Sequence, residues 1–185
     1  MNWGRFVCIA GLVGLVFGLA PSTSWAQLKI GYIDPQKILE SYKPYLDADK
    51  EFKRYEEELS REISKQQNEL AKMQETYERQ ALLLSDKRKQ EEQQAILKKR
   101  QDLERFVAEA TDPQRGRLAQ KNVALSEPIF KKVNEMVKRV AEDSGYDFVL
   151  NTAALAYANE AHNLTEKVLE ALNKDLEASE AESGQ

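Results

Sequence analysis

The amino-acid sequence predicts an α+β fold that is predominantly α-helical, in which a long antiparallel helical hairpin, a coiled-coil arm, stands on a small strand-containing body. Three observations support this prediction. Residues 47–112 contain neither glycine nor proline and are dominated by Glu, Lys, Gln, Arg, Leu and Ala, all of which favour helix. Short apolar segments typical of strands lie before and after this region, near residues 28–33 and 146–150. Scattered glycines and prolines divide the rest of the chain into shorter elements.

The first 26 residues have the pattern of a secretory signal peptide. They carry one base, Arg5, and no acid, and residues 6–20 form an uninterrupted apolar run. Small Ser24 and Ala26 occupy the positions three and one before a cleavage at Gln27. An uncleaved membrane anchor is the alternative, although this run is shorter than the roughly 20 residues that a spanning helix needs. We therefore expect an exported protein.

Cleavage would leave residues 27–185, a length that supports one compact domain. Without Arg5 the chain keeps 26 of its 27 bases against 31 acids, a net charge of −5. The only cysteine, Cys8, leaves with the signal peptide, so neither disulfide nor thiol chemistry is expected. A single histidine, His162, and four scattered glycines provide no His-rich metal site and no phosphate-binding loop. We predict no catalytic residues, no metal, no cofactor and no enzymatic activity.

The mature chain begins with a strand and a short helix. Leu28, Ile30 and Tyr32 alternate with Lys29 and Gly31, which predicts a strand with one apolar face. The sequence Asp34-Pro35 ends the strand, and proline suits the first position of a helix over 36–42.

The arm is predicted over residues 47–127. Its first helix carries an apolar stripe in which pairs eleven residues apart recur, a period typical of a nearly straight helix pair. The stripe comprises Phe52, Tyr55, Leu59, Ile63, Leu70, Met73, Tyr77, Ala81 and Leu84, with Gln66 in a gap. Ser85 suits the N-cap of a returning helix, so we place the tip of the hairpin near 83–87. The returning helix offers Ile96, Leu97, Leu103, Phe106, Val107 and Ala110.

Prolines mark the base of the arm and an interruption within it. Pro44 and Pro128 lie at similar distances from Ser85, so a fold there brings both to one height, where we place the base. Pro113 and Gly116 fall within the returning helix and predict a break or hinge.

The body is predicted from residues 27–46 and 128–176. It comprises a helix from Pro128 ended by Ser144-Gly145, strands over 146–150 and 153–158, and a helix opened by a capping box at 163–166. Residues 177–185 are expected to form a disordered acidic tail. Three short strands are too few for an independently stable sheet. We expect copies of the chain to complete it through Leu28, Ile30, Tyr32, Phe148, Leu150 and Ala156.

Segments along the chain, the most specific of them at its two ends, resemble the Skp (OmpH-like) periplasmic chaperones. They are the secretory signal, the strand 29–34, the turn at 83–85, and segments 145–150, 156–158 and 164–169. The resemblance spans nearly the whole mature chain and implies a periplasmic homotrimer whose strands form a central body and whose three arms surround a cavity. It also implies ATP-independent binding of unfolded outer-membrane β-barrel proteins, kept soluble for membrane insertion. This chain departs from better-known members, which are basic, in being acidic.

Under this resemblance the arm is expected to bind unfolded clients through apolar side chains surplus to hairpin packing. The candidates are Met73, Tyr77, Leu82, Leu83, Leu84, Ile96 and Leu97, for each of which packing within the hairpin is the alternative. Residues 79–105 carry eight bases and five acids, so the distal arm could attract anionic segments or touch membrane headgroups. The bases nearest the tip are Lys87, Arg88, Lys89, Lys98, Lys99 and Arg100, for which a solvated helix face is the alternative.

The sequence is compatible with two functions. The first is a trimeric holdase for unfolded outer-membrane proteins, which needs neither a nucleic acid nor a small-molecule substrate. The second is a structural coiled-coil protein of the envelope, an adaptor or spacer between fixed partners.

Overall fold

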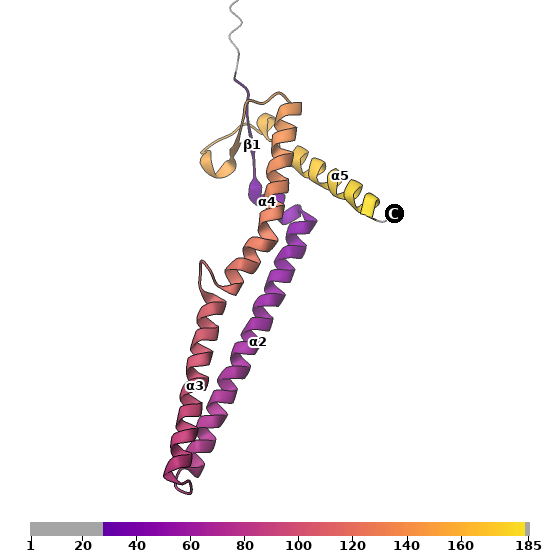
Figure 1. The fold of residues 1–185 in the computed structure, drawn as a ribbon. Coiled ribbons are helices and arrows are strands. Elements are labelled where there is room, and N and C mark those ends of the chain that lie inside the picture. The colour runs from indigo at the N-terminus through magenta and orange to yellow at the C-terminus, as the bar shows by residue number, and fades with distance from the viewer. Residues whose placement is uncertain (1–27, 184–185) are drawn as a thin grey trace, which may run out of the picture.

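A long two-helix arm extends from a small body in the structure, a computed structural model that describes residues 28–183 (Figure 1). The fold is predominantly helical with a small sheet, which confirms the predicted class. The predicted signal peptide lies outside the described residues. In chain order the elements are β1 (Ile30–Ile33), α1 (Pro35–Ser41), α2 (Lys43–Gln80), α3 (Asp86–Thr111), α4 (Arg117–Asp143), β2 (Phe148–Asn151), the 3₁₀ turns η1 (Thr152–Ala154) and η2 (Glu160–His162), and α5 (Thr165–Ser183).

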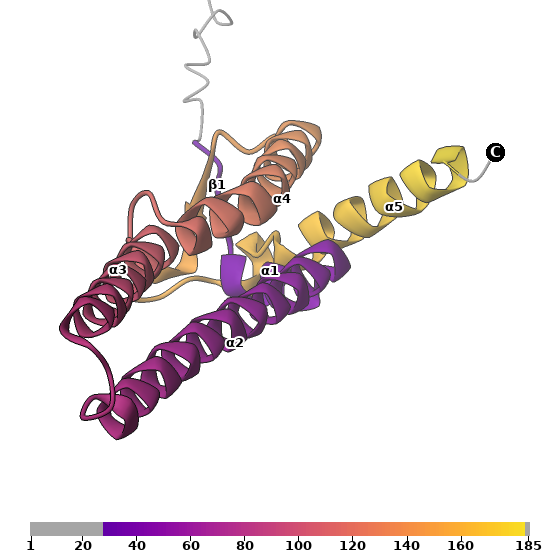
Figure 2. The ribbon, with the colours of Figure 1, turned by 60° about the horizontal axis from the view of Figure 1, so that its bottom comes forward.

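The arm is an antiparallel pair in which α2 faces α3 and the first part of α4 (Figure 2). Every residue of the predicted α2 stripe is buried or half-buried, and Leu59 is the most deeply buried of them. Helix α3 begins at Asp86, and the Ser85 hydroxyl accepts a hydrogen bond from the N–H of Arg88 at 3.4 Å. The predicted packing face and N-cap are therefore confirmed.

The return of the arm is interrupted between α3 and α4. The Asp112 carboxylate accepts hydrogen bonds from the backbone N–H of Arg115 at 2.6 Å and of Gln114 at 2.9 Å. These bonds stabilise the charged carboxylate and lower the pKa of Asp112. Gly116 packs so closely that a Cβ there would lie 2.5 Å from the Asp112 carbonyl oxygen. The predicted break is confirmed as an ordered turn, and its action as a hinge stays a prediction.

Gly116→Ala should lower the free energy of unfolding by about 2 kcal/mol, because backbone atoms of the turn would have to move. The nearby Gln114→Ala should change it by less than about 0.5 kcal/mol, since only the backbone of Gln114 is used in the turn. Urea unfolding followed by circular dichroism measures both. Equal stability of the two variants would mean that the turn is not held in this conformation.

Helix α4 passes through Pro128 without a break, whereas we expected the body helix to begin there. A proline inside a helix removes one hydrogen bond and costs about 3 kcal/mol. Packing on both sides of it offsets this cost: Ile129 and Val133 are buried in the body, and Lys121 forms an ion pair with Glu51 of α2 at 2.6 Å. The boundary between arm and body therefore falls within one continuous helix.

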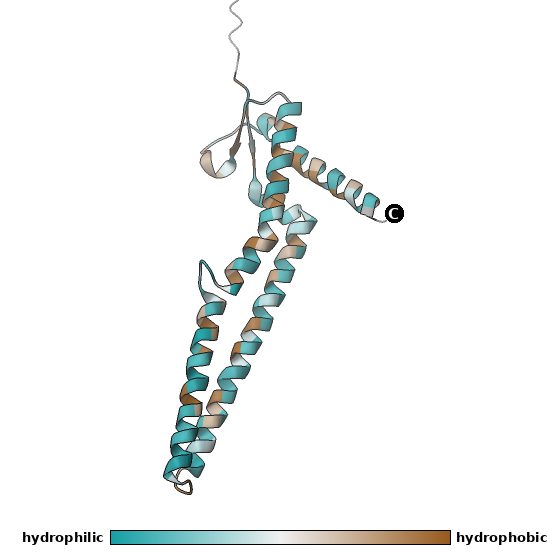
Figure 3. Cartoon of the chain, in the orientation of Figure 1, coloured by the Kyte–Doolittle hydropathy of each residue, from teal (hydrophilic) through white to brown (hydrophobic). Residues whose placement is uncertain are grey.

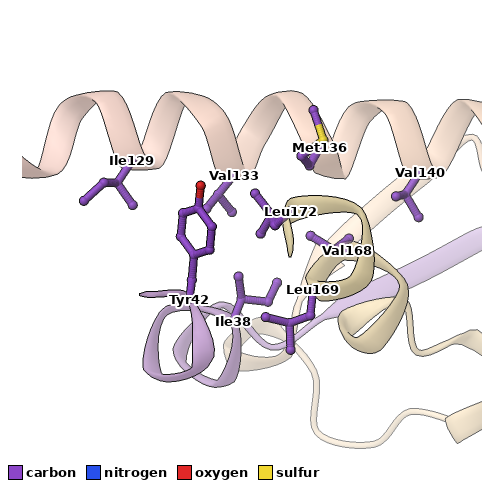
Figure 4. Packing of buried hydrophobic residues seen from close by; sticks show 9 residues of the cluster. All are labelled: Ile38, Tyr42, Ile129, Val133, Met136, Val140, Val168, Leu169 and Leu172. Carbon is purple, nitrogen blue, oxygen red and sulfur yellow. The ribbon is translucent and has the colours of Figure 1, made fainter. Parts of the chain in front are cut away.

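The body has its own hydrophobic core, built by three helices (Figure 4). Helix α4 lies on one side, and α1 and α5 lie on the other. The buried residues are Ile38, Tyr42, Ile129, Val133, Met136, Val140, Val168, Leu169 and Leu172. We expected the body to be held together mainly by a sheet that other copies of the chain complete. Its core is instead formed by helices of one chain.

The sheet consists of β1 and β2, which pair in parallel with Ile30 opposite Phe148 and Tyr32 opposite Leu150. The prediction of a further strand over residues 153–158 is wrong. Asn151 and Asn159 each accept a hydrogen bond from the backbone N–H two residues later, at 2.9 and 3.0 Å. These local bonds favour turns over an extended ladder, so Ala156 lies in a bend between two 3₁₀ turns.

The C-terminal end of α4 agrees with the prediction, whereas both ends of α5 differ from it. Helix α4 ends as expected at Ser144-Gly145, with Gly145 at φ 67° and Tyr146 N–H donating to the Ala141 carbonyl, the pattern of a Schellman motif. Helix α5 begins at Thr165, so Asn163 lies outside the cap position, although its side chain accepts from Thr165 N–H. Helix α5 continues to Ser183. The prediction of a disordered tail from residue 177 is therefore wrong for residues 177–183. A Glu180–Lys43 ion pair joins its last turns to α2.

Candidate functional site

The apolar candidates of the arm divide into two groups. Leu82 and Leu83, in the loop between α2 and α3, are 95% and 88% exposed, and Leu97 on α3 is also exposed. The other four are half-buried between the helices: Met73, Tyr77, Leu84 and Ile96. Packing within the hairpin therefore uses most of the surface of the second group and leaves the first group free.

The apolar tip, Leu82 and Leu83, lies at the end of the arm farthest from the body (Figure 3). The arm on either side of it is mainly hydrophilic. Ala81 and Leu84 border the same loop and are half-buried. Two fully solvated leucines at the end of a polar rod form a contact surface that the fold itself does not use.

A shallow groove of about 280 Å³ lies beside the tip between α2 and α3. Tyr77 and Ile96 line it from the two helices, and the exposed Leu97 continues it outward. The Tyr77 hydroxyl accepts a hydrogen bond from Gln93 Nε2 at 2.6 Å, and Arg100 lies at the rim. The structure thus brings three of the predicted apolar residues and one predicted base to one groove.

The six predicted bases of the distal arm differ in their surroundings. Arg88 pairs with Glu91 at 2.9 Å and Lys89 with Asp86 at 3.7 Å, while Lys99 crosses to Glu69 of α2 at 2.8 Å. The other three bases, Lys87, Lys98 and Arg100, are exposed, and within the described residues they form no ion pair shorter than 4 Å. About half of the predicted positive surface is therefore neutralised by neighbouring carboxylates.

The body presents an apolar sheet face on one side of β1 and β2. Paired residues of a parallel sheet share a face, and Ile30 and Phe148 form such a pair with 43% and 55% exposure. Leu28 and Leu150 are exposed as well. These four residues, the sheet face, remain available to another molecule.

The remaining two candidates of the body lie elsewhere. Tyr32 is only 6% exposed, because the segment that contains Glu160 and Asn163 covers it within the chain. Burial, followed by the charge of Glu160, raises the pKa of its phenol. Ala156 is exposed in a bend and not in a strand. Tyr32 is thus an interior residue of the single chain.

Sequence reasoning missed three further exposed apolar residues. Tyr157 was expected within a strand, yet it is largely exposed between the two 3₁₀ turns. On α4, Phe130 and Val123 are exposed, although Ile129, the neighbour of Phe130 in the chain, is buried. Val123 and Phe130 are seven residues apart, a spacing that places both side chains on the same side of a helix. This spacing was the sequence signal for a shared exposed flank.

Residues 28–183 contain no group of three His, Cys, Asp or Glu side chains arranged to hold a metal ion. In the same region no helix combines the length and apolar character needed to cross a bilayer.

The family model of OmpH-like outer membrane proteins matches residues 29–172, from β1 to the core turns of α5. The chain belongs to the OmpH-like family. The match includes the arm, its tip and both strands, so the resemblance carried by the two ends of the sequence is confirmed.

Relatives of this OmpH-like chain include two proteins named chaperone protein Skp. The Pectobacterium atrosepticum protein is 26% identical over 166 residues, which cover 89% of this chain and 96% of the relative. The Vibrio cholerae protein is 41% identical over 54 residues, which cover 29% of this chain and 32% of the relative. A crystal structure of an OmpH-like outer membrane chaperone from Caulobacter crescentus shares the fold, with a TM-score of 0.71, 13% identity and coverage of 81% and 86% of the two chains.

Proposed function

We propose that this protein is an ATP-independent periplasmic holdase that binds unfolded outer-membrane β-barrel proteins and keeps them soluble for membrane insertion. The observation that carries the proposal is the apolar tip, where Leu82 and Leu83 are solvated at the end of a polar arm. Unfolded barrel chains expose apolar side chains along their length. A holder for them needs several weak apolar contacts that release easily, and the tip and its adjoining groove provide such contacts.

The proposal includes a homotrimer. The sheet face and the unpaired outer edge of β2 would contact other copies, because exposed apolar surface and open strand edges favour association. Three arms attached to one body would then surround a shared cavity. Enclosure would supply many weak contacts at once, which raises the overall affinity without any single tight site.

A structural adaptor or spacer of the envelope is the second candidate. It is favoured by the largely polar arm, whose apolar residues are mostly used in packing α2 against α3 and α4. An adaptor would bind one folded partner and ignore unfolded chains.

Dilution of several unrelated barrel proteins from urea separates the two functions. Light scattering measures whether the mature protein suppresses aggregation without nucleotide. The holdase predicts suppression for all of the clients at comparable concentrations, whereas suppression of none would support the adaptor. Transient contact of the tip with membranes is tested separately by co-sedimentation with anionic vesicles.

Leu82→Ser with Leu83→Ser should weaken client holding about tenfold, because two apolar contacts of up to ~1 kcal/mol each are removed from every arm. Unfolding free energy should stay within about 0.5 kcal/mol of the wild type, since both side chains are solvated. The measurement is the protein concentration that halves aggregation of a diluted barrel protein.

A buried leucine of the arm provides the contrasting control. Leu103→Ser should lower stability by about 2–4 kcal/mol, because Leu103 is buried on α3. Unchanged holding by the double tip variant would exclude the tip as a client contact.

A further inference from the structure

Helix α5 extends beyond the part of the chain that matches the OmpH-like family. The match ends at Leu172, the last core residue of α5, whereas the helix continues to Ser183. We call residues 173–183 the C-terminal extension. It adds about three turns of helix, which project from the body beside the base of α2 (Figure 1). None of the nine core residues of the body lies in it, so core packing does not explain why the helix continues.

The first turn of the C-terminal extension is anchored to α4 by charge. The Asp175 carboxylate lies 2.5 Å from the Lys132 ammonium and 4.0 Å from the Arg139 guanidinium. The side chains of Lys132 and Asp175 are 35% and 26% exposed, so water screens this pair only in part. Leu176, the next residue, is half-buried. The extension is therefore held on the body from its first turn.

Both connections between the body and the arm contain a weak point. Tyr42, a single residue in extended conformation, joins α1 to α2, and its side chain makes no capping hydrogen bond to α2. Pro128 removes one backbone hydrogen bond from α4 where that helix passes from the arm to the body. A change in the direction of the arm would therefore concentrate at these two positions.

The charged anchor of the extension lies close to both weak points. Lys132 follows Pro128 by about one turn of α4. The Tyr42 side chain is buried beside the same helix (Figure 4). Burial raises the pKa of the Tyr42 phenol, and two charges also act on that pKa: Lys132 lowers it and Asp175 raises it. Both members of the anchoring ion pair therefore lie near the residue from which the arm starts.

The last turns of the C-terminal extension reach the arm itself. The Glu180 carboxylate lies 3.6 Å from the ammonium of Lys43, the first residue of α2. Both side chains are more than half exposed, so this ion pair is weak on its own. Together with Asp175 it attaches one helix at two points, to the body and to the arm, on opposite sides of the Tyr42 joint.

We propose that the C-terminal extension is a brace that fixes the direction of α2 relative to the body, with Asp175 and Glu180 as its positioning residues. Rotation at Tyr42 would separate Glu180 from Lys43 while Asp175 stays on α4, so the two attachments together oppose it. Salt screens exposed ion pairs, and the direction of the arm therefore depends on ionic strength. The consequence for clients, how far apart the arms stand, rests on the proposed function.

The test measures the direction of the arm by electron–electron spin-label distances in the full mature protein. Residues 27–185 contain no cysteine, so labels are attached only at the introduced positions. These are Lys65→Cys on α2 and Asn134→Cys on the body part of α4, both exposed. Labelled protein is unfolded and refolded with an excess of unlabelled protein, so that an assembly contains at most one labelled chain.

The brace variant combines Asp175→Asn with Glu180→Gln, which removes both charges and keeps the size of the side chains. A matched control combines Glu170→Gln with Glu177→Gln, two exposed acids of the same helix. Within residues 28–183 neither of these two acids forms an ion pair within 4 Å. Both variants change the net charge by the same amount.

The wild type should give one narrow distance distribution. The brace variant should raise the population outside this peak about fivefold, because both attachments are lost, and should keep its helical content by circular dichroism. The control should match the wild type. Raising the salt concentration from about 0.1 M to about 1 M should move the wild type towards the brace variant and leave that variant unchanged.

An unchanged distance distribution in the brace variant would overturn the inference, and a lower stability alone would mean that the extension serves only the fold of the body. Equal broadening in the control would overturn it as well, because net charge would then explain the effect. A charge exchange tests the arm attachment separately. Lys43→Glu alone should broaden the distribution, and Lys43→Glu with Glu180→Lys should restore the narrow peak. A double variant as broad as the single one would contradict the brace.

Barrel holding distinguishes this inference from the proposed function. If the wild type fails to hold barrel proteins while the brace variant still broadens the distribution, the holding function fails and the brace stands. If the wild type holds barrel proteins and the brace variant keeps the narrow distribution, only the brace inference fails.

Discussion

Ile30→Asp combined with Phe148→Asp should convert the assembled protein into monomers that keep their helical content. The two residues are partners across β1 and β2, and both side chains are exposed in the single chain. The monomer fold should therefore tolerate the change. Burial of two carboxylates in an apolar interface costs several kcal/mol, which corresponds to at least a hundredfold weaker association. Analytical ultracentrifugation gives the mass, and circular dichroism checks the fold.

Two further variants make this experiment specific. Leu82→Asp with Leu83→Asp places the same charges on two exposed leucines at the tip, far from the sheet face, and should leave the oligomer intact. Tyr32→Asp should instead destabilise the chain itself, because Tyr32 is buried within one subunit. A trimer that survives the sheet variant at micromolar concentration would show that the sheet face is not the contact between copies.

Removal of residues 56–117, with a short Gly-Ser linker between Tyr55 and Leu118, should abolish client holding and leave the body folded. All nine buried core residues of the body lie outside the removed segment. The cut also keeps the Glu51–Lys121 ion pair and the Lys121 ammonium 5.8 Å from the centre of the Tyr55 ring, which join α2 to α4 at the base. Loss of the cavity removes many simultaneous contacts, so at least about a hundredfold loss of holding is expected.

The outcome of the arm deletion is measured by two independent readouts. Multi-angle light scattering gives the mass of the shortened protein, which should equal that of the assembled body. Aggregation of a urea-diluted barrel protein gives its holding activity. An assembled body that still suppresses aggregation would place the binding site in the body and not in the arm.

The sequence alone determined the arm, because its signals are local. The absence of glycine and proline from 47–112, the eleven-residue period and the Ser85 cap depend on helix propensity, helix geometry and one hydrogen bond. The same holds for the Asp112–Gly116 turn and for the C-cap at Gly145. Each of these features uses residues close together in the chain, so the sequence displays it directly.

Which candidate residues remain exposed follows from contacts made in the folded chain. Tyr77 and Leu82 both looked like surplus apolar residues, yet one packs between two helices and the other is solvated. Tyr32 and Ile30 share the apolar alternation of one strand, but the distant segment that contains Asn163 covers only Tyr32. The continuation of α4 through Pro128 likewise depends on packing against α1, α2 and α5. Exposure is set by contacts between segments distant in the chain, and neither propensity nor periodicity contains that information.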